Sequence, residues 1–166
     1  MRICTKELSK FVGVHPMLIA IFGESCTGKS TLAGLLREKL DAKVYSGKDY
    51  LRLAKNEDNA RAAFVSVLEQ ASLGDSTVIY LISEPKHLSL LPKRCLRVRV
   101  TAPLSIIQSR FAYRMGGTLP QVIAERLAAV HGAFDNVDCD IAVDGSKPAQ
   151  GECERILEAL QAQANG

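Results

Sequence analysis

The sequence of 166 residues contains no tryptophan and few aromatic residues, which make up 5% of the chain. Its five cysteines are scattered and none belongs to a C-x-x-C pair, so their spacing indicates neither a zinc site nor a disulfide framework. Reduced thiols are typical of the cytoplasm, where we expect this protein. The sequence also lacks an apolar run of membrane-spanning length and a signal-peptide core, so we expect no membrane partner.

A strong charge of one sign is absent as well. The chain has 21 Lys and Arg against 18 Asp and Glu, for a net charge of +3. This balance suits an anionic small molecule but does not indicate a nucleic-acid partner. A chain of this length buries roughly 70% of its unfolded surface, so we expect one domain over residues 1–166, with residues 1–16 as an N-terminal extension.

One motif is nevertheless highly informative. Residues 19–30 read Ile-Ala-Ile-Phe-Gly-Glu-Ser-Cys-Thr-Gly-Lys-Ser and contain the phosphate-loop pattern G-x-x-x-x-G-K-[ST]. The apolar run before it, 18–22, predicts a buried parallel strand, and the apolar spacing within 31–40 predicts a helix after it. Because the motif requires this strand–loop–helix context, we expect ATP to bind here with Mg²⁺.

Each residue type in the loop suits a polyphosphate. Gly23 and Gly28 free the backbone so that N–H groups can face phosphate oxygens, Lys29 supplies a mobile charge, and Ser30 offers a hydroxyl to Mg²⁺. We expect Glu24 to point outward and to use only its backbone. The predicted nucleotide-binding residues are Gly23, Glu24, Ser25, Cys26, Thr27, Gly28, Lys29, Ser30 and Thr31.

Strands and helices alternate through the rest of the chain. Further strands are predicted at 42–45, 77–82, 95–100 and 140–143, and further helices at 50–73 (with a break at 56–59), 103–115, 121–131 and 152–163. The strand at 95–100 alternates in polarity, which predicts a half-exposed or edge strand. Alternating strands and helices predict an α/β fold: a three-layer α/β/α P-loop NTPase with a five-stranded parallel sheet.

Polar clusters at 23–30, 46–49 and 83–86 each follow a predicted strand, so they should meet at the carboxyl edge of the sheet. The sequence lacks the N-K-x-D base reader of GTPases. It also lacks the apolar run ending in Asp-Glu that motor ATPases show, since Val78–Ile82 is followed by Ser83-Glu84. The compact P-loop kinases remain.

Four segments resemble the nucleoside-monophosphate kinase family, which includes adenylate kinase. The phosphate loop is the first. The others are Tyr45-Ser-Gly-Lys-Asp-Tyr-Leu-Arg52, similar to S-T-G-D-[ML]-[LF]-R; Arg110-Phe-Ala-Tyr-Arg114, similar to the arginine pair that leads into the lid; and Val143-Asp-Gly-Ser-Lys-Pro148, similar to V-D-G-T-K-P. Ser83-Glu84-Pro85-Lys86 departs from the family's D-G-F-P-R. The lid is reduced to about 115–120, and about 50–73 would bind the acceptor.

The resemblance implies roles for particular residues. Lys29, Asp49, Arg110 and Arg114 would be catalytic, with the two arginines clamping the transferred phosphoryl group. Asp49, Arg52 and Lys86 would bind the acceptor, and Ser30, Asp49 and Glu84 would hold Mg²⁺. Gly145–Pro148 would pass by the adenine. Simpler interpretations stay open: Asp49 as a helix cap, Arg52 and Glu84 as solvated surface charges, and His131 as a C-cap.

Three functions follow as hypotheses. The first is an ATP-dependent kinase of a nucleoside monophosphate, whose phosphate Arg52 would hold. The second is a kinase of a small-metabolite alcohol, such as shikimate, gluconate or an antibiotic, with Asp49 as the base that takes the hydroxyl proton. The third is an ATP-binding regulatory module without a small acceptor, suggested by the altered segment 83–86. The protein itself would be a monomer or a homodimer.

Overall fold

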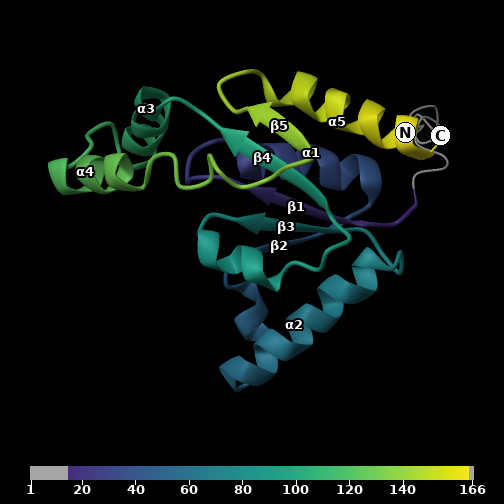
Figure 1. The fold of residues 1–166 in the computed structure, drawn as a ribbon. Helices are drawn as coiled ribbons and strands as arrows, with labels where there is room; N and C mark the ends of the chain where they lie inside the picture. The colour runs from purple at the N-terminus through teal and green to yellow at the C-terminus, as the bar shows by residue number, and fades with distance from the viewer. Residues whose placement is uncertain (1–14, 165–166) are drawn as a thin grey trace, which may run out of the picture.

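A five-stranded parallel sheet lies at the centre of the computed structural model, which describes residues 15–164 (Figure 1). The strand order is β2-β3-β1-β4-β5, and all four pairings are parallel. The strands are β1 (Leu18–Phe22), β2 (Lys43–Ser46), β3 (Val78–Ile82), β4 (Leu96–Thr101) and β5 (Ile141–Asp144). The predicted α/β fold and its strand number are therefore confirmed, whereas the predicted extension lies almost wholly outside the described residues.

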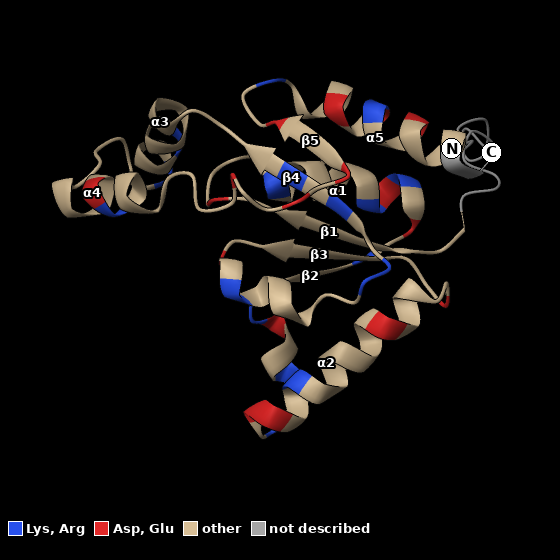
Figure 2. Ribbon diagram, in the orientation of Figure 1, with Lys and Arg blue, Asp and Glu red and all other residues tan. Residues whose placement is uncertain are grey.

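Helices cover both faces of this sheet (Figure 1). On one face α1 (Lys29–Leu40) and α5 (Ala149–Ala164) enclose a core with alternate residues of the strands, and on the other face α2 (Glu57–Ser72) does so. Both central strands that flank the phosphate loop, β1 and β3, are buried along their whole length. Acidic and basic residues are mixed along α2 and α5, so neither helix presents a face of one charge (Figure 2).

The remaining helices lie beyond the carboxyl edge of the sheet. Helices α3 (Leu104–Arg114) and α4 (Gln121–Val130) form an arm that projects past the ends of β1 and β4, on the left in Figure 1. The predicted lid at 115–120 is the turn between them. Two short 3₁₀ helices, η2 (Asp49–Arg52) and η3 (Pro85–Leu90), follow β2 and β3 at the same edge. The arm and the 3₁₀ helices thus border the edge where the polar clusters meet.

One local prediction is confirmed and one needs correction. Of the two alternatives predicted for strand β4, the half-exposed one is confirmed; the strand is not at an edge, because it pairs with both β1 and β5. Its polarity alternates because one side faces the α1–α5 core, while Arg99 on the other side donates to the carbonyls of Asp135 and Val137. The helix predicted from residue 50 is a 3₁₀ turn, and α2 begins only after Asn56, whose side chain caps it.

Within residues 15–164, none of the helices combines the length and the apolar character that crossing a bilayer requires.

Candidate active site at the phosphate loop

The phosphate loop lies where the sheet order reverses, because β1 has β3 on one side and β4 on the other. The Gly23 N–H donates to the Ile82 carbonyl at 3.1 Å, and a Cβ on Gly23 would overlap the Val100 carbonyl. Gly28 has a φ of 103° and precedes α1 without a side-chain cap. The first-turn N–H groups of α1 are therefore left to a ligand, as anion binding requires.

The charged side chain of Lys29 is buried against this loop. Its side chain is 6% exposed, and Nζ donates to the Glu24 carbonyl at 2.6 Å, which also accepts from the Thr27 hydroxyl. The pKa of Lys29 is lowered to about 8, chiefly by burial; Cys26 and Glu24 oppose this effect, and the positive charge of Arg114 adds to it slightly. Because the buried ammonium group is held by one carbonyl, it is suited to exchanging that partner for the phosphate oxygens of a ligand.

Arg110 joins the phosphate loop to the loop after β5. Its guanidinium donates to the Cys26 carbonyl at 3.1 Å and to the Gly145 carbonyl at 2.6 Å. A Cβ on Gly145 would overlap the Thr27 carbonyl, so only glycine permits this close packing. Arg110, expected to clamp the transferred phosphoryl group, is thus occupied with two backbone carbonyls in this structure and acts as a brace.

A cavity of about 550 Å³ opens beside this brace. Arg110 and Arg114, one helical turn apart on α3, line it together with the loop residues Cys26–Gly28 and the segment Val143–Gly145. The structure therefore brings the predicted nucleotide-binding loop, both arginines and the predicted adenine-side segment to one place. We refer to this space as the donor cavity.

Glu24 does more than was predicted from the sequence. Its side chain leaves the loop but is only 11% exposed, and its carboxylate accepts from the Gly132 N–H at 2.7 Å and lies 3.1 Å from His131 Nδ1. The expectation that only its backbone is used is wrong. His131 is the C-cap of α4, as expected, and in addition joins the end of the arm to the phosphate loop.

Asp49 and Glu84 follow the neighbouring strands β2 and β3 at the carboxyl edge of the sheet. Asp49 Oδ2 accepts the Ser46 N–H at 2.9 Å and closes the turn after β2; it is the first residue of η2 and not its N-cap, which is Lys48. Burial raises the pKa of Tyr80, whose hydroxyl donates to Gly47, and the charges of Asp49 and Glu84 raise it further. Both carboxylates therefore lie near the same buried hydroxyl.

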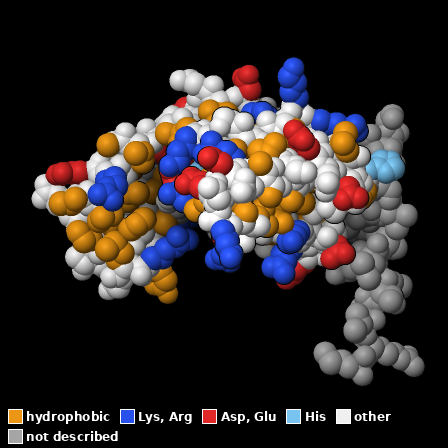
Figure 3. Space-filling view, turned by 90° about the horizontal axis from the view of Figure 1, so that it is seen from below, with side chains coloured by type: hydrophobic (Ala, Val, Ile, Leu, Met, Phe, Trp, Pro, Cys, Tyr) orange, Lys and Arg blue, Asp and Glu red, His pale blue; other side chains and the backbone are white. Residues whose placement is uncertain are grey.

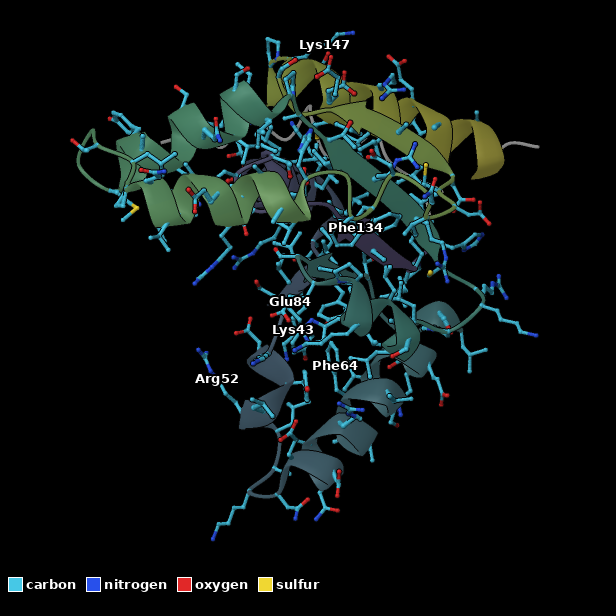
Figure 4. The ribbon with its side chains drawn as sticks, turned by 60° about the vertical axis from the view of Figure 1, so that its left-hand side comes forward. Lys43, Arg52, Phe64, Glu84, Phe134 and Lys147 are labelled. Carbon is cyan, nitrogen blue, oxygen red and sulfur yellow. The ribbon has the colours of Figure 1, made fainter. Side chains whose placement is uncertain are left out.

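The charged side chains at this edge of the sheet are partly paired with each other. Lys86 Nζ lies 2.8 Å from Glu84 Oε2, which lowers the pKa of Glu84 and raises that of Lys86. Arg52 is 86% exposed and reaches Asp49 only at 3.9 Å. In Figure 4, Glu84 lies between the arm and η2, Arg52 projects outward from η2, and Lys147 lies far from both beside α5.

A second cavity, of about 740 Å³, lies between the arm, η3 and the start of the phosphate loop. Glu24 and Ser25 line it, whereas Cys26–Gly28 line the donor cavity, so the loop separates the two spaces. We refer to it as the arm cavity. Four α4 residues that line it were not among those predicted from the sequence: Ile123, Arg126, Leu127 and Val130. Their spacing of three and four residues indicates one helix face and is the pattern from which they could have been predicted.

The oxygens present suit Mg²⁺, which keeps several waters and takes few protein ligands. Ser30 is exposed in the first turn of α1, and Asp49 and Glu84 supply carboxylates after β2 and β3 at the same edge of the sheet. Within residues 15–164, no three or more His, Cys, Asp or Glu side chains are grouped so that they could hold a metal ion.

No protein-family model matches the sequence, and no curated protein matches it. Solved structures do match in fold. A shikimate kinase from Acinetobacter baumannii in complex with shikimate aligns with a TM-score of 0.64 and 16% identity, over 93% of this chain and 98% of that one. A gluconokinase from Sinorhizobium meliloti 1021 aligns with a TM-score of 0.60 and 17% identity (91% and 95%).

A sugar kinase from Janibacter sp. HTCC2649 aligns similarly, with a TM-score of 0.60 and 19% identity, over 87% of this chain and 94% of that one. These alignments extend over most of both chains. With the strand order and loop geometry above, they show that this chain has the P-loop kinase fold.

Proposed function

We propose that this protein is an ATP-dependent kinase that transfers the γ-phosphoryl group to a hydroxyl of a small molecule. The observation that carries the proposal is the position of the phosphate loop between two cavities. A triphosphate laid along the loop would have its base in the donor cavity and its terminal phosphate toward Ser25 and the arm cavity. An acceptor in the arm cavity would then face the phosphorus that it attacks.

In this proposal the acceptor oxygen forms a bond to the γ-phosphorus in line with the bond that breaks, and ADP leaves with the electron pair of the bridging oxygen. The hydroxyl proton passes to Asp49, whose carboxylate is oriented by the Ser46 N–H. Lys29 and Arg114 stabilise charge on the transferring group. When bound through Ser30, Asp49 and Glu84, Mg²⁺ would neutralise phosphate charge.

A hydroxyl acceptor fits better than the nucleoside monophosphate expected first. The similar structures are named for sugar, gluconate and shikimate, and this favours the alternative function. The exposure of Arg52 agrees with this choice, because the side chain that would hold an acceptor phosphate is 86% exposed to solvent. The nucleoside-monophosphate acceptor is therefore not supported.

The test is a screen for acceptor-dependent ATP consumption, in which common nucleoside monophosphates are compared with sugars and other alcohols. On the best acceptor, Asp49→Asn should lower kcat by about 10²- to 10⁴-fold, since the neutral amide cannot take the proton. Asp75→Asn is the matched control, because Asp75 lies in an exposed turn before β3, at the edge of the sheet opposite the phosphate loop. Unchanged turnover by Asp49→Asn would contradict Asp49 as the base.

A further inference from the structure

The wall of the arm cavity is made largely of apolar side chains. Ile107 and Phe111 line it from α3, and Ile123, Leu127 and Val130 line it from α4, so each helix turns one apolar stripe toward the space. Pro85 and Phe134 complete the wall. Figure 3 shows hydrophobic side chains gathered on the underside of the arm, at the left, next to a hollow in the surface.

Most ionic groups at this cavity are already paired. Glu24 is bound by the Gly132 N–H and lies beside His131, and Glu84 is paired with Lys86. Within residues 15–164, Arg126 is the one ionic lining residue without such a partner. A ligand with many hydroxyls would lose water there and gain few hydrogen bonds, which costs free energy for each group left unpaired.

We propose that the acceptor of this kinase is an alcohol with an apolar alkyl or aromatic body, and not a polyhydroxylated sugar or sugar acid. The proposal rests on the kinase function proposed above. The apolar body lies against the α3 and α4 stripes, and the hydroxyl points to the end of the cavity where Ser25 and Ser83 meet the terminal phosphate. The occupant is a small molecule because the cavity opens onto the phosphate loop itself.

A homologous series of primary alcohols tests this directly. Each methylene buried against the stripes should raise kcat/KM about fourfold, the equivalent of ~0.8 kcal/mol for each CH₂ removed from water. The kcat/KM should therefore increase from butan-1-ol to hexan-1-ol to octan-1-ol. 3-Phenylpropan-1-ol should also be a substrate. The kcat/KM for gluconate and for shikimate should be lower than the value for hexan-1-ol or octan-1-ol.

Two variants on one helix locate the effect. Val130 lines the cavity and is 49% exposed, whereas Val122 is 67% exposed and lies outside it. Val130→Gln should flatten the dependence of kcat/KM on chain length, because it places a polar group on the apolar wall. Val122→Gln should leave that dependence unchanged. Both positions are exposed enough that neither change should prevent folding.

The outcomes separate the two proposals. A rise in kcat/KM with chain length that Val130→Gln flattens supports the apolar acceptor. Turnover of gluconate or shikimate above that of the alcohols overturns it while leaving the hydroxyl-kinase proposal intact. Turnover of none of these compounds, with ATP binding intact, counts against the kinase proposal itself and removes the basis of this one. A chain-length effect that Val122→Gln alters as much as Val130→Gln also overturns it.

Discussion

Lys29 has a buried ammonium group whose pKa is lowered to about 8 before any phosphate binds. A lysine is charged below its pKa, so its attraction for a polyphosphate is fully present well below pH 8 and is lost as the pH rises through that value. A bound polyphosphate raises the pKa again, because the two charges are opposite. Nucleotide affinity should therefore depend on pH in a range where the other phosphate-binding groups change little.

We predict that the Kd for an ATP analogue rises about eightfold between about pH 7.5 and pH 9, the loss expected for one group with a pKa near 8. Calorimetric titration at several pH values measures this. Lys29→Arg, whose guanidinium stays charged throughout, should give a nearly flat profile. If the wild-type Kd also stays flat, Lys29 does not control this step.

The loop after β5 and the phosphate loop are packed backbone to backbone, with Arg110 donating to both. A Cβ at Gly145 would force the two apart because it would meet the Thr27 carbonyl. Gly34 offers a matched control, since it lies inside α1 with nothing within 4 Å of its Cβ position. Comparing alanine substitutions at the two positions separates the effect of close packing from the effect of the backbone flexibility that glycine adds.

We predict that Gly145→Ala lowers the free energy of unfolding by about 1–3 kcal/mol, as overpacking does, and weakens nucleotide binding. Gly34→Ala should raise the free energy of unfolding by about 0.5–1 kcal/mol, since alanine is the better helix residue, and leave nucleotide binding unchanged. Urea unfolding measures both. Equal stability changes in the two variants would mean that the loops can separate freely.

The helices and strands were largely predictable from local sequence patterns, whereas the contacts between them were not. Apolar periodicity predicts β1, β3 and the helices that follow, because burial enforces those periods. The bond between Glu24 and Gly132 joins positions 108 residues apart, and no local pattern encodes it. For the same reason the alternating polarity of β4 left open whether it lies at an edge, since its partner β5 comes about 40 residues later in the chain.

In the whole molecule, the layered α/β fold followed from the alternation of strands and helices, and the phosphate loop was recognisable as a motif. The proposed acceptor site was not predictable in the same way, because the arm cavity is lined by the phosphate loop, η3 and the arm, which are far apart in the sequence. The segment that ends at Arg52 resembles a family motif, yet the Arg52 side chain is 86% exposed. The shape and polarity of the arm cavity therefore depend on how the arm and the sheet edge come together.

The central claim is that the phosphate loop is the donor half of a two-substrate site. Incubation with γ-labelled ATP, Mg²⁺ and a deproteinised cell extract tests it without choosing an acceptor in advance. The account predicts that label passes into a phosphate monoester of an alcohol, released by alkaline phosphatase, and that Asp49→Asn abolishes this transfer. Label found only in a nucleoside diphosphate would leave the two-substrate site standing but would contradict the hydroxyl acceptor. Label found only in inorganic phosphate, as a regulatory ATPase would give, would contradict the central claim itself.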